Sequence, residues 1–307
     1  MRPKTTLILG AGASCPYGFP TASELREILV QKNPTRVKEI LDRLNAPSRL
    51  GDIVMRSLLT RFPDKIIQRF QNEFFWSQTG SIDEFAQERG DVFTKVARVA
   101  LATIFLQCES SAYLDGNWYR AFRRWLLSKG PGSIPYDRVQ IITFNYDRSL
   151  EYYLWKAIQY TYDLPEGDAF DVAGHLLVHH VYGSLGRLRG STATTDAVTW
   201  ASTEDRFVDP AAESLHLVRP TSIGLPTEVA DFLTHSEFVC FLGFGFWPEN
   251  FRLVERHVGP AAQVFASNMG LAPVLAGKIQ SRFPKIVWGE GWTVDDCMQG
   301  WNLFPES

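Results

Sequence analysis

The feature that most constrains this chain is a short apolar run that ends in a glycine turn. Thr5–Leu9 is β-branched and apolar, and Gly10-Ala11-Gly12 follows it directly. This pattern predicts a buried strand that leads into a tight turn, where missing side chains let a ligand come close. Free N–H groups there favour an anion such as a diphosphate. A purely structural turn remains the alternative, because Cys15 occupies the third glycine position of the dinucleotide fingerprint.

Other apolar runs have the length and composition of buried strands. They predict strands over 138–144, 176–182, 238–242, 262–266 and 285–288. Helical spacing follows several of these runs, and Thr21-x-x-Glu24 has the spacing of a capping box. Residues 34–128 carry amphipathic helical stripes instead. We therefore expect an α/β fold with a Rossmann-like parallel sheet from residues 1–33 and 129–307, and a helical insertion subdomain over 34–128.

Polar residues stand where predicted strands end. Asn145 and Asp147 lie at a strand-to-helix junction, and His180 lies near the end of the next strand. Ligands of open α/β sheets bind outside the carboxyl ends of the strands, which makes these residues candidates for one site. Helix capping by Asn145 or Asp147 and a structural histidine are the alternatives. Because side chains alternate along a strand, His179 and His180 point to opposite faces, and His180 shares its face with Tyr182.

Two later segments, a polar stretch and a second glycine turn, also carry structural signals. Residues 187–222 are polar and rich in serine, threonine and arginine, which predicts a long loop with a short helix near Ala211. A lid over a site and a solvated surface loop are equal interpretations of that segment. Gly243-Phe244-Gly245 then forms a second glycine turn directly after a predicted strand.

Charge and cysteine usage exclude several functions. The formal net charge of −3 gives no overall field toward nucleic acid or an anionic membrane, so we expect no direct nucleic-acid binding. The four cysteines are scattered without metal-ligand spacing, which predicts no metal site and a reducing cytoplasm. No apolar run approaches the roughly 20 residues of a membrane span, so no membrane association is expected.

Four motifs, in chain order, resemble the NAD-binding landmarks of the sirtuin fold. They are Gly10-Ala-Gly-Ala-Ser14, Thr143-Phe-Asn-Tyr-Asp147, His180-Val-Tyr-Gly-Ser184 and Gly243-Phe-Gly-Phe246. The chain looks most like the bacterial SIR2-like branch, whose domain commonly consumes NAD in anti-phage defence. Ser81-Ile-Asp-Glu-Phe85 in the insertion resembles that branch as well. The resemblance implies a sirtuin-type sheet.

The resemblance also implies a role for each matching residue, with NAD as substrate and no metal. Asn145 would position the nicotinamide ribose or a water, Asp147 would contact the carboxamide, and His180 would be the general base. Asn250 is a weaker candidate. The residues that would hold NAD are Gly10, Ala11, Gly12, Ala13, Ser14, Thr21, Gly183, Ser184, Gly243 and Phe244.

These residue types suit cleavage of the nicotinamide–ribose bond. Nicotinamide leaves as a neutral base from an oxocarbenium-like sugar, so the protein must orient the ring, stabilise positive charge and present an acceptor. Two departures from sirtuin deacylases matter. Tyr182 stands where their catalytic histidine directly precedes the glycine, so His180 and Tyr182 both remain candidates for the base. The four-cysteine zinc module is absent, and Thr21-Ala22-Ser23 replaces their Asp-Phe-Arg.

The resemblance therefore implies a NAD hydrolase that acts as the NAD-depleting effector of an anti-phage defence system. A NAD- or ADP-ribose-binding subunit of a larger defence complex, with little turnover, is the second hypothesis. ADP-ribosyl transfer and deacylation come third, and a dehydrogenase last. The family also implies a homo-oligomer, and the chain's lack of a second catalytic domain suggests a separately encoded partner such as a motor ATPase or nuclease.

Overall fold

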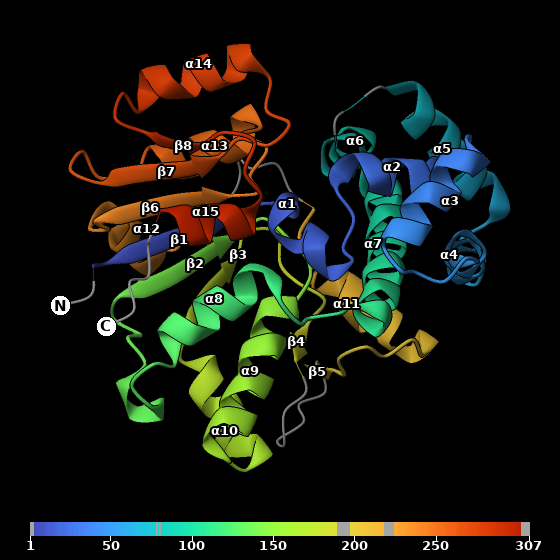
Figure 1. The fold of residues 1–307 in the computed structure, drawn as a ribbon. Coiled ribbons are helices and arrows are strands. Elements are labelled where there is room, and N and C mark those ends of the chain that lie inside the picture. Colours follow the sequence, from blue (N-terminus) through green and yellow to red (C-terminus); the bar gives the residue numbers. More distant parts are fainter. Residues whose placement is uncertain (1–2, 78, 80, 189–196, 218–223, 302–307) are drawn as a thin grey trace.

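The fold is built on a six-stranded parallel sheet with the strand order β3-β2-β1-β6-β7-β8 (Figure 1). The computed structural model describes residues 3–77, 79, 81–188, 197–217 and 224–301. The chain starts at β1, builds outward to β3, and then returns to build the other half from β6. This is the strand order of the doubly wound dinucleotide-binding fold. The predicted α/β class and Rossmann-like sheet are confirmed. The strands are β1 (Thr5–Leu9), β2 (Val139–Thr143), β3 (Leu177–His180), β6 (Phe238–Leu242), β7 (Gln263–Ser267) and β8 (Val287–Gly289).

The first strand lies in the middle of the sheet. Thr5 of β1 pairs with Val139 of β2 on one side and with Phe238 of β6 on the other. All residues of β1 and β2 are buried, as parallel strands covered on both faces require. Each predicted strand is present, and no end differs from the prediction by more than two residues.

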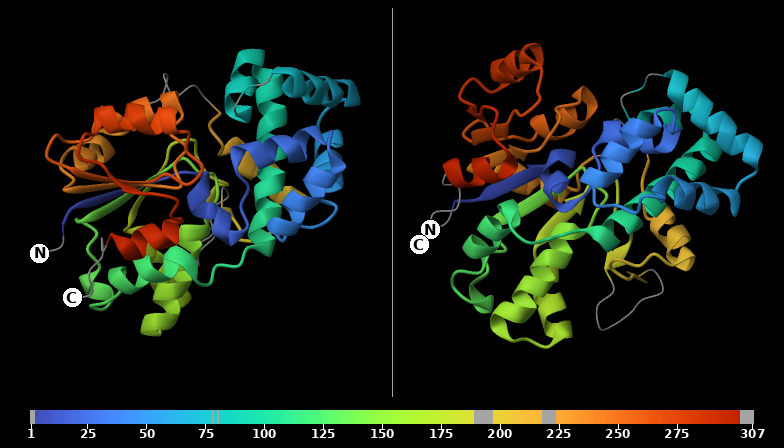
Figure 2. Two further views of the ribbon diagram at one scale, coloured as in Figure 1. Left: turned by 45° about the horizontal axis from the view of Figure 1, so that its top comes forward. Right: turned by 45° about the vertical axis from the view of Figure 1, so that its right-hand side comes forward.

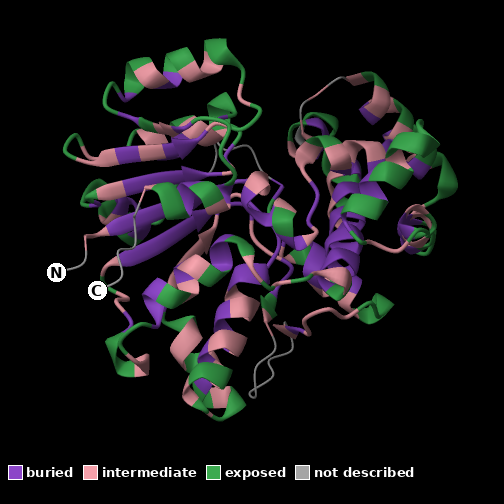
Figure 3. Cartoon of the chain, in the orientation of Figure 1, coloured by how far each residue is buried: buried purple, intermediate pink, exposed green. Residues whose placement is uncertain are grey.

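Helices cover both faces of the sheet. Helices α8, α9 and α15 lie on one face, and α12 and α13 lie on the other (Figures 1 and 2). α10 packs beside α9. The central strands β1, β2 and β6 are buried along most of their length, whereas β3 is half-buried throughout (Figure 3). The bounds are α8 (Asn117–Leu126), α9 (Ser149–Tyr162), α10 (Glu166–Gly174), α12 (Thr227–Thr234), α13 (Pro248–Glu255), α14 (Pro273–Arg282) and α15 (Val294–Gly300).

A helical lobe lies beyond the carboxyl ends of the strands (Figures 1 and 2). Its central helix, α7 (Asp91–Ser111), is buried over most of its length. Around it lie α2 (Ala22–Val30), α3 (Pro34–Arg43), α4 (Leu50–Leu59), α5 (Asp64–Ser77) and α6 (Ile82–Arg89). The lobe therefore includes α2, which precedes the predicted insertion. α8, the last helix of the predicted insertion, packs instead on α9 and α15.

The predicted capping box at the start of α2 is confirmed. The Thr21 side chain accepts a hydrogen bond from the backbone N–H of Glu24, and the Glu24 carboxylate accepts one from the backbone N–H of Thr21. Such reciprocal bonds satisfy two donors that a helix start otherwise leaves free. Ser81 also caps α6 by accepting from the backbone N–H of Glu84.

The polar segment 187–222 contains the predicted short helix near Ala211, α11 (Val208–Glu213), which packs against α7. Two short strands precede it, β4 (Arg187–Leu188) and β5 (Ala197–Val198), and they pair in parallel. Positions 189–196 and 218–223 of the predicted lid or loop lie outside the described residues. No helix in the described ranges has both the length and the apolar character needed to cross a bilayer.

Candidate functional site

The four predicted motifs meet at the carboxyl ends of β1, β2, β3 and β6. The side-chain amide of Asn145 donates to the backbone carbonyl of Gly10 at 3.0 Å and to Oγ of Ser14 at 2.9 Å. The backbone N–H of Gly12 donates to the carbonyl of Gly243 at 3.0 Å, which joins the β1 turn to the β6 turn. The direction in which strands are added to the sheet reverses between β1 and β6, the position at which folds with this strand order bind ligands.

The two glycine turns pack backbone against backbone. A Cβ on Gly10 would lie 2.6 Å from the carbonyl oxygen of Gly243, and Gly243 itself has a φ of 57°. The glycines are therefore required by the contact between the turns. The N–H groups of Gly12 and Ala13 both donate to carbonyls within these turns. These two N–H groups are therefore not free to bind a phosphate. The predicted diphosphate site depends on the other polar groups of α1 (Ala11–Ser14).

Asn145 is the residue that ties the β1 turn to the end of β2. It is buried, and both hydrogens of its amide are used by Gly10 and Ser14. Oδ1 is then the remaining polar atom of this side chain, and an amide oxygen can stabilise positive charge on a bound ligand.

Asp147 places a carboxylate in the same buried region. Its Oδ1 accepts from the backbone N–H of Ser149 at 3.2 Å and from the Ser149 hydroxyl. Its Oδ2 is buried and has no hydrogen-bond partner among the residues that the structure describes. Burial raises the pKa of this carboxyl, the serine hydroxyls of Ser149 and Ser14 offset part of the rise, and the charge of Glu151 adds to it. The Ser14 hydroxyl acts from nearby without a hydrogen bond of normal geometry to Oδ2.

An acceptor left buried without a donor costs free energy. Oδ2 of Asp147 is therefore a group that a ligand donor can satisfy. A carboxylate with a raised pKa at the end of a strand is also a frequent mark of an active site.

Side chains of helix α8 hold both the β1 turn and Asp147 in position. The indole N–H of Trp118 donates to the carbonyl of Ala13 at 2.8 Å. The hydroxyls of Tyr119 and Ser149 share a hydrogen bond of 2.7 Å, which continues to Asp147. The rings of Tyr17 and Tyr119 stack with centroids 3.8 Å apart. These contacts fix the positions of the candidate site residues.

His180 is engaged through both ring nitrogens. Nδ1 lies 2.9 Å from the backbone carbonyl of Asn145, and Nε2 lies 2.6 Å from a carboxylate oxygen of Glu151. A carbonyl only accepts, so Nδ1 carries a hydrogen. Burial opposes the charged form, but the Glu151 carboxylate and the hydrogen bonds outweigh it, and the pKa of His180 is raised. In this arrangement the ring is a charged group that holds Asn145 in place.

Sequence reasoning did not identify Glu151. It follows Asp147 by four positions at the start of α9, a spacing that puts both residues on one side of a helical turn. This four-residue spacing is the one sequence signal that could have identified Glu151.

The two nearby tyrosines are also engaged. The hydroxyl of Tyr182 donates to Oδ1 of Asn250, and the hydroxyl of Tyr146 donates to Oδ1 of Asp83. Burial raises the pKa of both tyrosines. Asp83 belongs to the Ser81–Phe85 motif, so the helical lobe contributes a residue to this region. His179 has a separate environment in which burial lowers its pKa.

The other predicted NAD contacts have structural partners. The Thr21 hydroxyl donates to Glu24 in the capping box. Phe244 packs in a buried aromatic cluster, with its ring centroid 5.1 Å from that of Phe144. Gly183 has a φ of 70°, and a Cβ there would lie 2.1 Å from the carbonyl oxygen of Ser214. Ser184 lines a neighbouring cavity.

A buried ion pair, which sequence reasoning also missed, links the helical lobe to the sheet. Arg148 Nε donates to Glu109 Oε1 at 2.9 Å, and its Nη2 donates to Oε2 at 2.7 Å. Its Nη1 donates to the carbonyls of Val198 and Gly186. Both charged side chains are almost wholly buried, at 2% and 0% exposure. Arg148 directly follows Asp147, so this pair anchors the candidate site to α7.

Comparison with known proteins yields no family assignment: no protein-family model matches the chain, and no curated protein is significantly similar to it. Within the described ranges, no cluster of three or more His, Cys, Asp or Glu side chains has a geometry that could hold a metal ion. The four cysteines are free thiols, and burial raises the pKa of Cys15 to about 11.

Proposed function

We propose that this chain is a SIR2-like NAD hydrolase that releases nicotinamide. The observation that supports it most strongly is the junction between β1 and β2. There the Asn145 amide joins Gly10 to Ser14, and the unpartnered Oδ2 of Asp147 lies in the same buried region. The junction occupies the ligand-binding end of a sheet with dinucleotide-binding strand order.

The reaction breaks the bond between nicotinamide and the ribose. The bonding electron pair leaves with nicotinamide, water adds to the cationic ribose carbon, and the water gives up one proton. The products are nicotinamide, ADP-ribose and that proton. Oδ2 of Asp147 accepts a hydrogen bond from the carboxamide of the substrate, and Oδ1 of Asn145 stabilises the positive ribose.

His180 acts in this proposal as a positioning residue. Its charged ring holds the backbone of Asn145 and the carboxylate of Glu151. The general-base role predicted for His180 would require the ring to lose the proton that Glu151 stabilises.

The direct test is to incubate the purified chain with NAD and to quantify nicotinamide and ADP-ribose by chromatography. Asn145→Ala is expected to lower turnover by about 10²-fold, the usual cost of losing one preorganised polar group. Asn72→Ala is the matched control, because Asn72 is exposed on α5. Retained activity in both Asn145→Ala and His180→Ala would refute the mechanism.

A NAD- or ADP-ribose-binding subunit with little turnover is the second candidate. The engagement of His180 with Glu151 and of Tyr182 with Asn250 favours it, because both possible bases are occupied. Calorimetry that detects NAD or ADP-ribose binding, with no nicotinamide released even when products of neighbouring genes are added, would select this candidate.

The proposed biological role is depletion of the cytoplasmic NAD pool during phage infection, by a homo-oligomer activated by a separately encoded partner. Light scattering measures the oligomeric state. NAD levels in infected cells that carry the gene with and without its neighbours test both the role and the partner. An unchanged NAD level during infection would contradict the role while leaving the enzymatic proposal to the assay above.

A further inference from the structure

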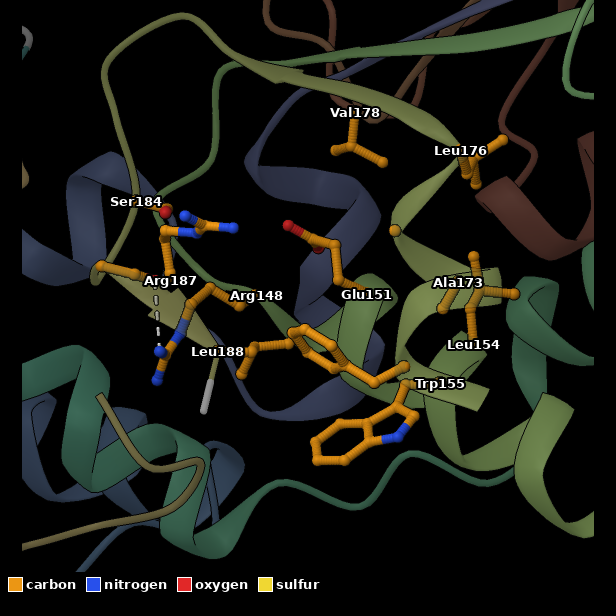
Figure 4. A pocket seen from close by; sticks show the side chains of 13 residues that line it. Arg148, Glu151, Leu154, Trp155, Ala173, Leu176, Val178, Ser184, Arg187 and Leu188 are labelled. Carbon is orange, nitrogen blue, oxygen red and sulfur yellow. Dashed lines mark hydrogen bonds between the residues drawn. The ribbon is translucent and has the colours of Figure 1, made fainter. Parts of the chain in front are cut away.

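A cavity of about 260 Å³ lies between α9, α10, β3 and the segment that leads into β4 (Figure 4). It adjoins the candidate site, because Glu151 lines it and holds His180. Its walls come from other elements than the glycine turns of β1 and β6. Its lining residues divide into a polar end and an apolar end.

At the polar end, one arginine has no ion-pair or hydrogen-bond partner among the residues that the structure describes. Arg148 is paired with Glu109, and Glu151 is paired with His180, so these charges are balanced. Arg187 is exposed and forms no hydrogen bond or ion pair with any described residue. Among the described residues, the polar end therefore carries one positive charge without an opposite charge beside it. Ser184, three positions before Arg187, adds a hydroxyl to the same lining.

The apolar end is formed by aliphatic and aromatic side chains from α9, α10 and β3. Leu154, Trp155 and Val178 point into it in Figure 4. The indole N–H of Trp155 already donates to the carbonyl of Glu166, and the Lys156 ammonium lies 4.0 Å from the centroid of its ring, so only the remaining ring surface faces a ligand. A ligand body without polar groups matches this end, because burying an unpaired polar group would cost free energy.

We propose that this cavity binds a small amphipathic anion with a single ring or a short aliphatic body and a carboxylate or phosphate group. The anionic group binds Arg187, and the body packs on Trp155 and its apolar neighbours. The cavity is smaller than the roughly 300–1,000 Å³ of sites for drug-sized ligands, so it suits one ring and excludes a dinucleotide. Arginine binds carboxylates and phosphates with charge-assisted, often bidentate hydrogen bonds.

The test compares four probes of similar shape by calorimetry with the full chain and without NAD, so its outcome is independent of the proposed hydrolase activity. Phenylacetate and phenyl phosphate are the anions, 2-phenylethanol is neutral, and 2-phenylethylamine is cationic. We expect at least one anion to bind about tenfold or more tightly than the alcohol. The better of the two anions identifies the ligand as a carboxylate or a phosphate. Equal binding of the alcohol, stronger binding of the amine, or no binding of either anion would overturn the proposal.

Three variants locate the bound anion. Arg187→Gln is expected to weaken anion binding about tenfold or more, and Arg56→Gln, at an exposed position of α4, is expected to leave it unchanged. Ala173→Phe adds a ring to the cavity wall and is expected to abolish binding. Thermal unfolding shows whether Ala173→Phe folds, and the two arginine variants decide the question if it does not. Unchanged affinity in Arg187→Gln would refute the assignment.

Discussion

At the level of single residues, Asp147 holds a carboxyl group where burial opposes its charge. Its pKa is raised, so at neutral pH the ionised group lowers the stability of the folded state. Asp147→Asn keeps the acceptor for Ser149 and removes the charge. We expect it to raise the free energy of unfolding at pH 7 by about 1 kcal/mol and to lower NAD cleavage.

Urea unfolding at pH 7 measures the stability effect. Asp52→Asn is the control, because the Asp52 side chain is 63% exposed on α4, and it should leave stability and turnover unchanged. A large loss of stability in Asp147→Asn would show that the carboxylate is a structural requirement rather than a functional cost.

The pair of His180 and Glu151 predicts a pH dependence of stability. The folded-state pKa of His180 is raised above its usual value, so the folded protein binds this proton more tightly than the unfolded chain. The resulting stability is fully present below the unfolded-state pKa of about 6.5 and is lost as pH rises through the raised value. Glu151→Gln should flatten this fall.

Unfolding free energies of the wild type and Glu151→Gln between pH 5.5 and 9 test that expectation. The Glu151 charge also raises the pKa of Asp147, so measuring both proteins in an Asp147→Asn background isolates the pair. A difference that stays constant across this range would contradict the assigned charge of His180.

Sequence patterns identified Asn145, Asp147 and His180 as residues at strand ends, and the structure places each there. They did not identify Glu151 or Glu109 as partners, because those contacts join residues 29 and 39 positions apart. Periodicity along one element carries no information about which distant side chain meets it. Tertiary packing alone decides such pairs.

At the level of elements, the contact between the two glycine turns is the one that most restricts substitution. Gly10→Ala would bring a methyl group to 2.6 Å from the carbonyl oxygen of Gly243 and within 2.7 Å of Phe244 Cα. Backbone cannot move aside cheaply, so we expect a loss of more than about 2 kcal/mol in the free energy of unfolding. Gly277→Ala in α14 is the control, since a Cβ there meets nothing within 4 Å.

Gly277→Ala is expected to stabilise the protein by about 0.5–1 kcal/mol through helix propensity. Chemical denaturation of both variants gives the comparison. Equal stability of Gly10→Ala and the wild type would mean that the turns can separate without cost.

Elements with strong local signals were predicted well. The predicted strand Phe238–Leu242 matches β6, and the short helix predicted near Ala211 is α11 (Val208–Glu213). β3 ends at His180, two residues before the predicted end. The β4–β5 pair was not predicted, because two-residue strands leave no periodicity and depend on each other for their hydrogen bonds.

At the level of the whole molecule, the ion pair between Arg148 and Glu109 joins the helical lobe to the sheet. Arg148→Ala would leave the buried Glu109 carboxylate without its partner. We expect a loss of about 3–5 kcal/mol in the free energy of unfolding, as is usual when one member of a buried pair is removed. Differential scanning calorimetry also shows whether the lobe then unfolds separately.

Lys38→Ala is the matched control, because it breaks an exposed pair with Asp42 on α3, and such pairs contribute little. If Arg148→Ala lowered the free energy of unfolding as little as this control does, water or another group would have to reach the Glu109 carboxylate. The double variant Arg148→Met with Glu109→Leu is expected to recover part of the loss.

The central position of β1 has a consequence for how the chain folds during synthesis. Thr5 pairs with Val139 and Phe238, so neither neighbour exists when β1 leaves the ribosome. At about 5–20 residues per second, β6 follows β1 by roughly 12–47 s. β1 has no partner strand until β2 is made, and one of its edges stays unpaired until β6 is made. This exposure makes the nascent chain a client for chaperones and places the slow, long-range closure of the sheet late in folding.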